Sequence, residues 1–327
     1  MSVVVLKSGL LSSLQDGGRP GYSALGVGRA GTIDGPAWRL ANALVGNTHD
    51  EAALEFTLIG PTLRFEQTTV IALSGAPTDA RVGDQSLPGW TCCVLPAGSV
   101  LQLGGMRQGC RGYLAVRGGF DVAAVLGSRS TDLNARIGPF DGRALQAGDR
   151  LQLGGSDPWP RLTSIKAPQV ARWSIDPQPW FDFAHASLAL LPGHHLDLLD
   201  EASQRALFSA DFTISKDSNR TASRLNGQRL SLRQPLELIS EATLPGTLQL
   251  PPSGQPILLQ VEAPVTGGYP RIGQLAAVDL PRLAQRRPGD TVCFRKTTLD
   301  EAWQRLASRQ QRLQRLLDSI ERRLESV

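Results

Sequence analysis

Leu95-Pro-Ala-Gly-Ser-Val-Leu-Gln-Leu-Gly-Gly105 joins a proline and glycine turn to a short run in which apolar residues alternate. The same unit recurs as Leu145-Gln-Ala-Gly-Asp-Arg-Leu-Gln-Leu-Gly-Gly155 and, in part, as Arg287-Pro-Gly-Asp-Thr-Val-Cys-Phe294. In each copy a glycine stands where the backbone reverses, and the period-two alternation of a β-strand follows. The chain holds 34 Gly and 22 Pro, enough to separate many short strands. These units predict a mainly β fold of barrels or sandwiches and not a doubly wound α/β sheet.

A second pattern occurs twice and indicates two related domains. It consists of an aspartate, an arginine three residues later, and a glutamate five residues before a glycine. The first copy is Asp16, Arg19, Glu55 and Gly60, and the second is Asp217, Arg220, Glu241 and Gly246. A chain of 327 residues is long enough for two domains. We therefore expect one β-barrel domain over 1–160 and another over 161–298, with the junction in the proline- and tryptophan-rich segment 157–176.

Few helices are expected. Residues 35–46 begin with Gly-Pro and end with Gly, with apolar residues at helical spacing between them, which predicts a short helix packed on a barrel. Residues 299–327 lack Gly and Pro and predict a long amphipathic helix. Its apolar positions are Trp303, Leu306, Leu313, Leu317, Ile320 and Leu324. At roughly 40 Å it is long for one barrel to cover, so it is either a docking element for a partner or a helix packed on its own domain.

Composition excludes several classes of protein. Hydrophobic residues make up 41% and charged residues 20%, as in ordinary globular proteins, and no run of about 18 apolar residues suits a membrane span. The N-terminus lacks a basic start and a cleavage site, so we expect a cytoplasmic protein. Although the net charge is +4, the arginines are scattered without interleaved aromatic residues, which argues against nucleic-acid binding.

The cysteines and histidines predict no metal centre. Cys92, Cys93, Cys110 and Cys293 lack CxxC spacing and are expected to be buried free thiols. His194-His195 follows Pro192-Gly193 in an expected turn, where histidines are usually exposed. His49 and His185 match no site pattern.

Longer motifs resemble a known family, the biotin-dependent carboxyltransferase-like family, also called allophanate hydrolase subunit 2. Its members include the KipA protein and the 5-oxoprolinase component PxpC. The likeness runs from about residue 3 to residue 298. The motifs that carry it are Gln15-Asp-Gly-Gly-Arg-Pro-Gly-Tyr22, Gly31-Thr-Ile-Asp34, Arg39-Leu-Ala-Asn-Ala-Leu-Val-Gly-Asn47, Arg111-Gly-Tyr-Leu-Ala-Val-Arg-Gly-Gly119, Leu126-Gly-Ser-Arg-Ser-Thr-Asp132, Pro251-Pro-Ser-Gly-Gln-Pro256 and Thr266-Gly-Gly-Tyr-Pro-Arg271.

The resemblance implies two cyclophilin-like β-barrel domains and a role in a hetero-oligomer. Related chains work with a KipI- or PxpB-like subunit, and in PxpC-like members a LamB/YcsF-like subunit, PxpA, completes an ATP-dependent 5-oxoprolinase. That enzyme opens 5-oxo-L-proline to L-glutamate while ATP is hydrolysed. Two alternatives stay open: the carboxyltransferase half of a biotin-dependent urea carboxylase or allophanate system, and a KipA-like antagonist of a kinase inhibitor that catalyses nothing.

The twin pattern supplies the candidate catalytic residues. A lactam carbonyl is a poor electrophile, and its activation by phosphorylation needs cations for the phosphoryl group and carboxylates for magnesium or acid–base work. The arginines suited to phosphate or carboxylate are Arg19, Arg220 and Arg271, and the carboxylates are Asp16, Glu55, Asp217 and Glu241. The structural alternative pairs Asp16 with Arg19, and Asp217 with Arg220, as salt bridges that lock turns.

Two further motifs are candidate anion sites. In Thr266-Gly267-Gly268-Tyr269-Pro270-Arg271 the glycines let backbone N–H groups approach an anion, while Thr266 adds a hydroxyl and Arg271 a charge. The alternative is a tight turn with Tyr269 in the core. The loop Gly127–Asp132, with Ser128 and Arg129, either holds an anion or caps a helix.

Cofactor motifs are missing from the sequence. It has no Gly-x-x-x-x-Gly-Lys-Ser/Thr, so ATP and Mg²⁺ are held in another way or by a partner subunit. It also has no Met-Lys-Met attachment sequence, so biotin, under the carboxylase alternative, arrives on another protein.

Overall fold

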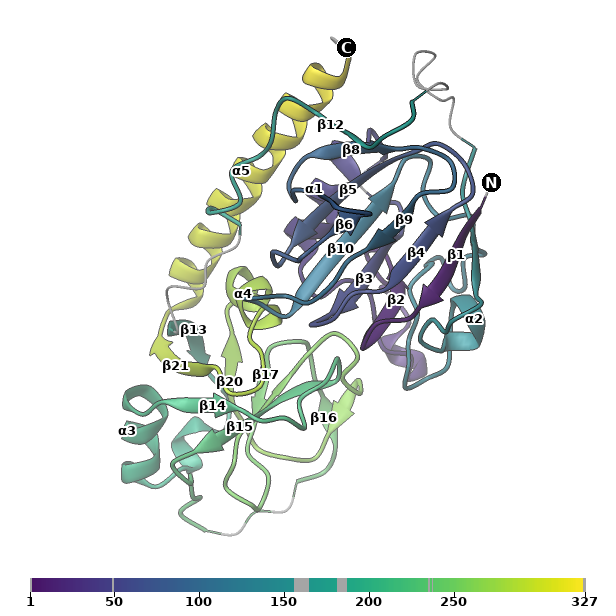
Figure 1. Cartoon of the computed structure of the whole chain (residues 1–327). Coiled ribbons are helices and arrows are strands. Elements are labelled where there is room, and N and C mark those ends of the chain that lie inside the picture. Colours follow the sequence, from purple (N-terminus) through teal and green to yellow (C-terminus); the bar gives the residue numbers. More distant parts are fainter. Residues whose placement is uncertain are drawn as a thin grey trace. The chain divides into compact units, whose positions relative to one another are not determined.

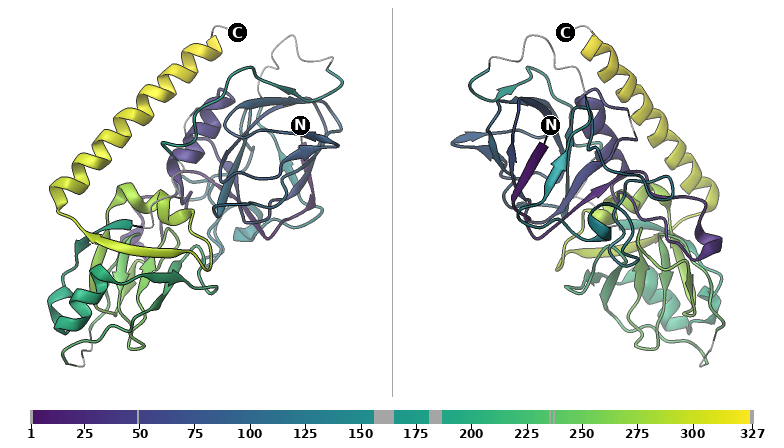
Figure 2. Two further views of the ribbon diagram at one scale, coloured as in Figure 1. Left: turned by 60° about the vertical axis from the view of Figure 1, so that its left-hand side comes forward. Right: turned by 90° about the vertical axis from the view of Figure 1, so that its right-hand side faces the viewer.

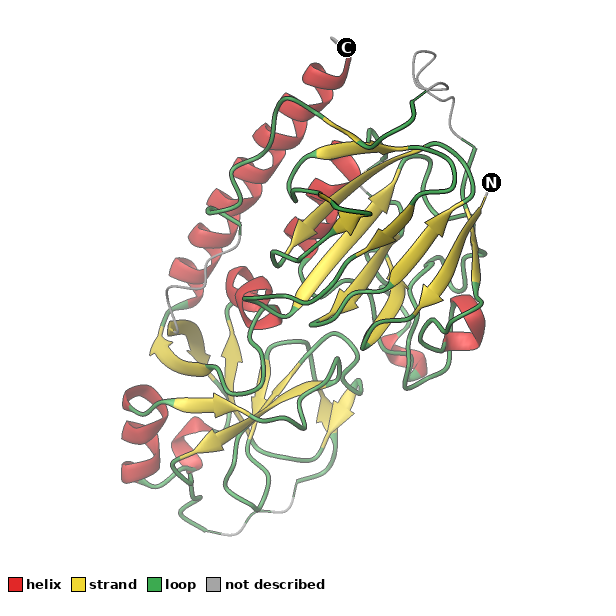
Figure 3. Ribbon diagram, viewed as in Figure 1, coloured by secondary structure: helices red, strands yellow, loops and turns green. Residues whose placement is uncertain are grey.

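The computed structural model describes residues 2–48, 50–155, 165–180, 187–234, 236 and 238–325. Strands predominate and helices are few, so the predicted mainly β fold is confirmed (Figure 3). The chain divides into two compact units (Figure 1). Unit 1 comprises Met1–Arg19, Asp34–Phe181 and Leu313–Val327, and unit 2 comprises Pro20–Ile33 and Asp182–Arg312.

The units differ from the predicted domain ends at 160 and 298. The chain beyond residue 160 stays with unit 1 because strand β12 (Gln169–Val170) pairs with β8 (Cys92–Leu95). The segment Pro20–Ile33 groups with unit 2 although its neighbours on both sides belong to unit 1. Of the predicted junction, residues 157–164 lie outside the described residues.

Unit 1 arranges its strands in two six-stranded antiparallel sheets. The first has the order β11 (Arg150–Gln152), β1 (Ser2–Lys7), β4 (Thr62–Phe65), β9 (Val100–Gln102), β6 (Arg81–Val82) and β7 (Gln85–Ser86). The second has the order β12, β8, β5 (Thr69–Gly75), β10 (Arg111–Val116), β3 (Ala53–Thr57) and β2 (Leu11–Gln15). Both sheets contribute to one core, with Val3 and Phe65 from the first and Phe56 and Leu114 from the second fully buried.

Helix α1 (Gly35–Leu44) covers the second sheet of unit 1 (Figure 2). Its first turn contains Pro36, and the side chain of Asp34 accepts a hydrogen bond from the Ala37 amide at 3.2 Å. These are the usual signals that start a helix. Trp38 and Leu44 are buried in a cluster that includes residues of β5 and β10, so the helix predicted over 35–46 is confirmed.

Unit 2 contains a closed barrel of seven strands. The barrel order is β13 (Ser187–Pro192), β20 (Arg271–Leu275), β17 (Thr247–Gln249), β18 (Ile257–Leu259), β15 (Ala222–Gly227), β14 (Phe212–Ile214) and β21 (Thr291–Lys296). The parallel pair β13 and β21 belongs to the closed ring, and Phe212, Leu225 and Leu248 are buried within it. Two short strands, β16 (Glu241–Ala242) and β19 (Thr266–Gly267), form a separate pair. The short helical elements of the two units are η1 (Ser23–Leu25), α2 (Pro139–Gly142), η2 (Leu196–Leu198), α3 (Glu201–Ser209), η3 (Ala277–Asp279) and α4 (Leu280–Ala284).

Helix α5 (Leu299–Glu325) confirms the predicted C-terminal helix. A capping box starts it, because the Glu301 amide donates to Thr298 Oγ1 at 3.3 Å and the Thr298 amide donates to Glu301 Oε2 at 3.2 Å. Its first half belongs to unit 2, where Arg305 pairs with Asp279 at 3.0 Å. Its second half belongs to unit 1, where Leu317 is buried. The apolar face from Leu306 to Leu324 therefore packs within the chain, whereas Trp303 is 67% exposed. Docking to a partner stays a prediction.

The described cysteines are free thiols, as predicted. Cys92, Cys93 and Cys110 are buried, and Cys293 is half-buried. Burial raises the pKa of Cys93 to about 12, so this side chain stays protonated at neutral pH. In the part of the chain that the structure describes, no helix has the length and apolar character needed to cross a membrane.

Truncation of Leu317 tests the packing of α5. Leu317→Ala is expected to lower the free energy of unfolding by about 2–5 kcal/mol, because its side chain is 1% exposed. The matched change Leu299→Ala, in the same helix, removes a side chain that is 69% exposed and should change that free energy by less than about 0.5 kcal/mol. Urea titration followed by circular dichroism measures both, and equal losses would contradict the packing described for this helix.

Candidate functional site

Asp16, directly after β2, organises the predicted anion loop Gly127–Asp132. Its carboxylate accepts hydrogen bonds from the hydroxyls of Ser128 and Ser130 and from the amides of Gly18 and Arg129, at 2.5 to 2.8 Å. Four donors saturate most of the lone pairs of a carboxylate. The loop therefore binds the carboxylate of Asp16, which is left with little capacity for a metal.

Arg19 is buried at 1% exposure without forming the expected salt bridge with Asp16. Its Nη2 donates to the carbonyl of Ser130, whereas Nε and Nη1 have no acceptor among the described residues. Leaving donors of a buried cation unsatisfied costs about 1–3 kcal/mol or more. Arg19 thus stays a candidate for binding an anion, and the salt-bridge interpretation of Asp16 and Arg19 was wrong.

Glu55 lies in the middle of β3, opposite Tyr113 of β10. The Tyr113 hydroxyl donates to Glu55 Oε2 at 2.7 Å and accepts the amide of Asp34 at 2.9 Å. Burial, together with the charges of Glu55 and Asp34, raises the pKa of Tyr113 well above its usual value, so the tyrosine is a donor at neutral pH. Tyr113 was missed from the sequence, where it looks like one more apolar strand residue.

The second copy of the twin pattern is not arranged like the first. Arg220 is buried and pairs through Nε with Glu262, whereas Asp217 is exposed. Arg220 also donates from Nη2 to the Gly31 carbonyl at 2.6 Å. The alternative that paired Asp217 with Arg220 was therefore wrong, because the partner of the arginine, Glu262, comes from the segment after β18.

The Thr266–Arg271 motif lies in contact with Glu241. Thr266 and Gly267 form β19, which pairs with Glu241 and Ala242 of β16. The guanidinium of Arg271 forms an ion pair with Glu241 and donates to the Ala242 carbonyl at 3.1 Å. Both side chains are partly accessible, at 27% and 47% exposure, so an anion from solution can compete for the arginine. Two candidate residues from separate sequence motifs thus belong to one cluster.

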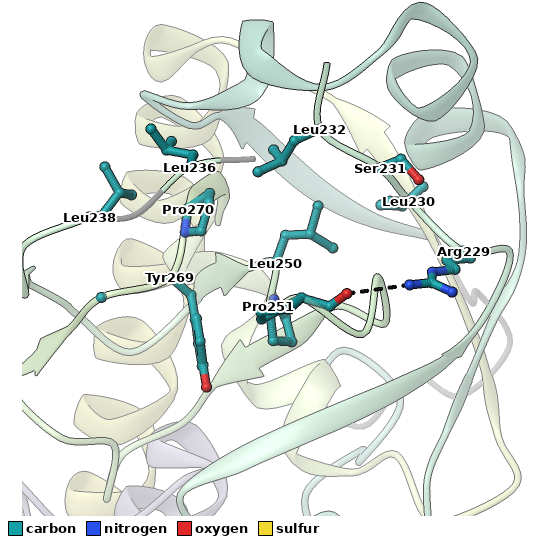
Figure 4. Close-up of a pocket in the computed structure, with 12 residues that line it drawn as sticks. Arg229, Leu230, Ser231, Leu232, Leu236, Leu238, Leu250, Pro251, Tyr269 and Pro270 are labelled. Carbon is teal, nitrogen blue, oxygen red and sulfur yellow. Dashed lines mark hydrogen bonds between the residues drawn. The ribbon is translucent and has the colours of Figure 1, made fainter. Parts of the chain in front are cut away.

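A pocket of about 640 Å³ lies beside this motif in unit 2 (Figure 4). Gly268, Tyr269 and Pro270 form one wall, and leucines and prolines form most of the remainder. Tyr269 is 45% exposed and lines the pocket, so the alternative that placed it in the core was wrong (Figure 4). The volume suits a small molecule with a largely apolar body.

His195 is a part of this cluster that the sequence did not predict. It is buried, and its Nδ1 accepts a hydrogen bond from the Arg271 amide at 3.0 Å, whereas the adjacent His194 is exposed as expected. Among the described residues no three His, Cys, Asp or Glu side chains gather as a metal site. His49 and His185 lie outside the described residues.

Breaking the buried pair distinguishes the true partner of Arg220 from the predicted one. Glu262→Gln should destabilise the fold by about 3–5 kcal/mol, because it leaves the charge of Arg220 buried without its ionic partner. Asp217→Asn removes an exposed carboxylate and should change stability by less than about 0.5 kcal/mol. Urea unfolding compares the two, and a larger loss for Asp217→Asn would contradict this assignment.

Comparison with known proteins gives the family. Residues 25–296 match the family described as carboxyltransferase domain, subdomain A and B. The chain is 41% identical over 300 residues to the C subunit of 5-oxoprolinase from Escherichia coli (strain K12), a match that covers 91% of this chain and 92% of that protein. The solved structure of Kluyveromyces lactis urea carboxylase is similar with a TM-score of 0.86 at 30% identity, over 98% of this chain but 29% of that chain. The chain belongs to the carboxyltransferase domain family, subdomain A and B.

Proposed function

We propose that this chain is a subunit of an ATP-dependent 5-oxoprolinase, a complex that opens 5-oxo-L-proline to L-glutamate with hydrolysis of ATP. The observation that carries the proposal is the 41% identity to the C subunit of a 5-oxoprolinase over nearly the full length of both chains. The match to urea carboxylase, in contrast, covers 29% of a longer chain. The proposed place of action is the cytoplasm.

The partly accessible cation of the Thr266–Arg271 motif supports this function. 5-Oxoproline carries a carboxylate, and a guanidinium binds carboxylate or phosphate through two parallel hydrogen bonds. Arg271 already binds one carboxylate, that of Glu241, at a place that solvent reaches. In the proposed complex the substrate anion replaces Glu241 on Arg271, and the released Glu241 can accept a proton from attacking water.

The pocket beside Tyr269 extends this arrangement in unit 2, because its apolar walls suit the methylene carbons of the lactam ring. Unit 1 offers a separate candidate, Arg19. This residue has two buried nitrogen donors, Nε and Nη1, without an acceptor among the described residues, and an anionic group would satisfy them. We infer that Arg271 and Arg19 are the anion-binding residues of their respective units, while Asp16, Glu55 and Arg220 serve the fold.

ATP and magnesium are proposed to bind mainly to partner subunits. ATP, when bound, supplies the phosphoryl group that activates the lactam oxygen. Among the described residues no three His, Cys, Asp or Glu side chains gather as a preformed metal site, and the sequence has no phosphate loop of the Gly-Lys-Ser/Thr type. Two relatives of this chain are named as the C subunit of 5-oxoprolinase, which supports a complex of several subunits. We propose a KipI/PxpB-like and a LamB/YcsF-like PxpA subunit as partners.

The second candidate function is the carboxyltransferase part of a urea carboxylase. It is favoured by the TM-score of 0.86 to the Kluyveromyces lactis enzyme. Biotin would then be delivered by another protein, and the test substrates are urea and a carrier whose biotin is already carboxylated, so that the carboxyl group passes from carboxybiotin to urea. Release of carboxylated urea without any turnover of 5-oxoproline would favour this second function.

The leading proposal is tested by mixing the chain with both partner subunits, 5-oxo-L-proline and ATP. Glutamate and ADP should form in equal amounts, and only from the complete mixture. Arg271→Met should lower kcat/KM by roughly 10- to 100-fold, because a hydrogen-bonded charge pair with the substrate is lost. Arg205→Met, which removes an exposed arginine that also pairs with a glutamate, is the control and should leave the rate unchanged. A complete mixture that produces no glutamate would refute the proposal.

A further inference from the structure

The turn that carries His195 lies directly on the start of β20. The amide of His195 donates to the carbonyl of Arg271 at 3.0 Å, and the amide of Gly193 donates to the carbonyl of Ile272 at 3.1 Å. A Cβ atom at Gly193 would lie 2.4 Å from the Arg271 oxygen, so a side chain is excluded there. The turn after β13 therefore continues the pairing of β13 with β20 as far as Arg271.

At Arg271 the imidazole takes the place of a backbone acceptor. The Arg271 amide donates to Nδ1 of His195 at 3.0 Å. Only an unprotonated nitrogen can accept this bond, so Nδ1 carries no proton and the ring is in its neutral form with the proton on Nε2. Because Pro270 has no N–H group, the amide of Arg271 is the first main-chain donor at this end of β20.

The charged groups around the ring favour its neutral form. Burial lowers the pKa of His195, and His194, on the same turn, and Arg271, on β20, lower it further, while Glu241 on β16 opposes them. The His194 ring lies 5.0 Å from the His195 ring, measured between centroids. In the unfolded chain the pKa of a histidine is about 6.5. The stabilisation by the neutral ring is therefore complete above that pH and is lost as the pH falls through the folded pKa.

Arg271 is thus held from two sides. His195 binds its main chain, and Glu241 binds its side chain. The ion pair with Glu241 is accessible and can exchange for an anionic ligand, whereas His195 is buried and its bond to the main chain does not take part in that exchange. The imidazole thus helps to fix the main chain from which the guanidinium extends.

We propose that His195 is a positioning residue for Arg271, and that the motif binds its anion only while the imidazole is neutral. Protonation places a second N–H group against the Arg271 amide, so this hydrogen bond breaks and the main chain of Arg271 loses one of its two bonds to His195. The identity of the anion in this inference rests on the proposed function. The hydrogen bond between His195 and Arg271 is independent of that function.

The bond is tested by nuclear magnetic resonance on the chain alone, labelled with ¹⁵N in Arg and His. A scalar coupling between the Arg271 amide nitrogen and His195 Nδ1 should be seen at neutral pH and vanish as the imidazole is protonated. Addition of inorganic phosphate should shift the Arg271 guanidinium signals only in the neutral form. A missing coupling at neutral pH, or phosphate shifts that persist after protonation, would overturn the proposal whether or not the chain serves a 5-oxoprolinase.

Variants then connect the bond to catalysis in the reconstituted complex. His195→Asn keeps an acceptor at the equivalent atom but does not titrate. It should therefore retain the activity, and its kcat/KM should fall less at acidic pH than that of the wild type. His195→Phe keeps a ring without an acceptor and should lower kcat/KM by about tenfold at every pH. Arg205→Met, which removes an exposed arginine that pairs with Glu201, is the control and should keep the wild-type pH profile. An unchanged acidic limb in His195→Asn would contradict the proposal, and absence of turnover in the wild-type complex would refute the proposed function instead.

Discussion

A charge that is buried in a β-structure must be given hydrogen-bond partners, and this constraint accounts for most of the polar arrangement in both units. Asp16 accepts hydrogen bonds from four donors, Glu55 accepts one from Tyr113, and Arg220 forms an ion pair with Glu262. In each case the main partners come from other strands or loops, so the pairing fixes which segments lie together. The geometry of such a pair serves the fold first. A side chain already saturated in this way has little capacity left for a ligand.

The same constraint separates the residues that are available for chemistry. Arg271 and Glu241 form a pair that solvent reaches, and exchanging one carboxylate for another on Arg271 costs little desolvation. Arg19 is the opposite case, because it is buried with donors that no described residue accepts. These two arginines are therefore better candidates for binding an anion than Arg220, although all three looked equivalent in the sequence.

The fold could be predicted where its signals are local. Alternating apolar residues between glycine turns predict strands such as Val100–Gln102 and Arg150–Gln152, and the proline and glycine of residues 35–46 predict α1. The unit boundary could not be predicted, because it depends on a two-residue pairing between β12 and β8. The site pairs failed for the same reason: Arg220 and Glu262 are 42 residues apart, and His195 and Arg271 are 76 apart. A spacing of three residues, as in Asp16 and Arg19, suggests a contact that long-range pairing can override.

The carboxyltransferase fold by itself does not decide between a lactam and urea, because both substrates present an amide carbonyl. The chemical difference is the carboxylate, which 5-oxoproline carries and urea lacks. An arginine that releases an internal carboxylate in exchange for an external one is useful only for an anionic substrate or a phosphoryl group. Under the proposed function, specificity therefore lies in whether Arg271 can be freed from Glu241 while its main chain stays fixed. His195 supplies that fixed point, since its bond is made to the backbone and does not compete with the ligand for the guanidinium.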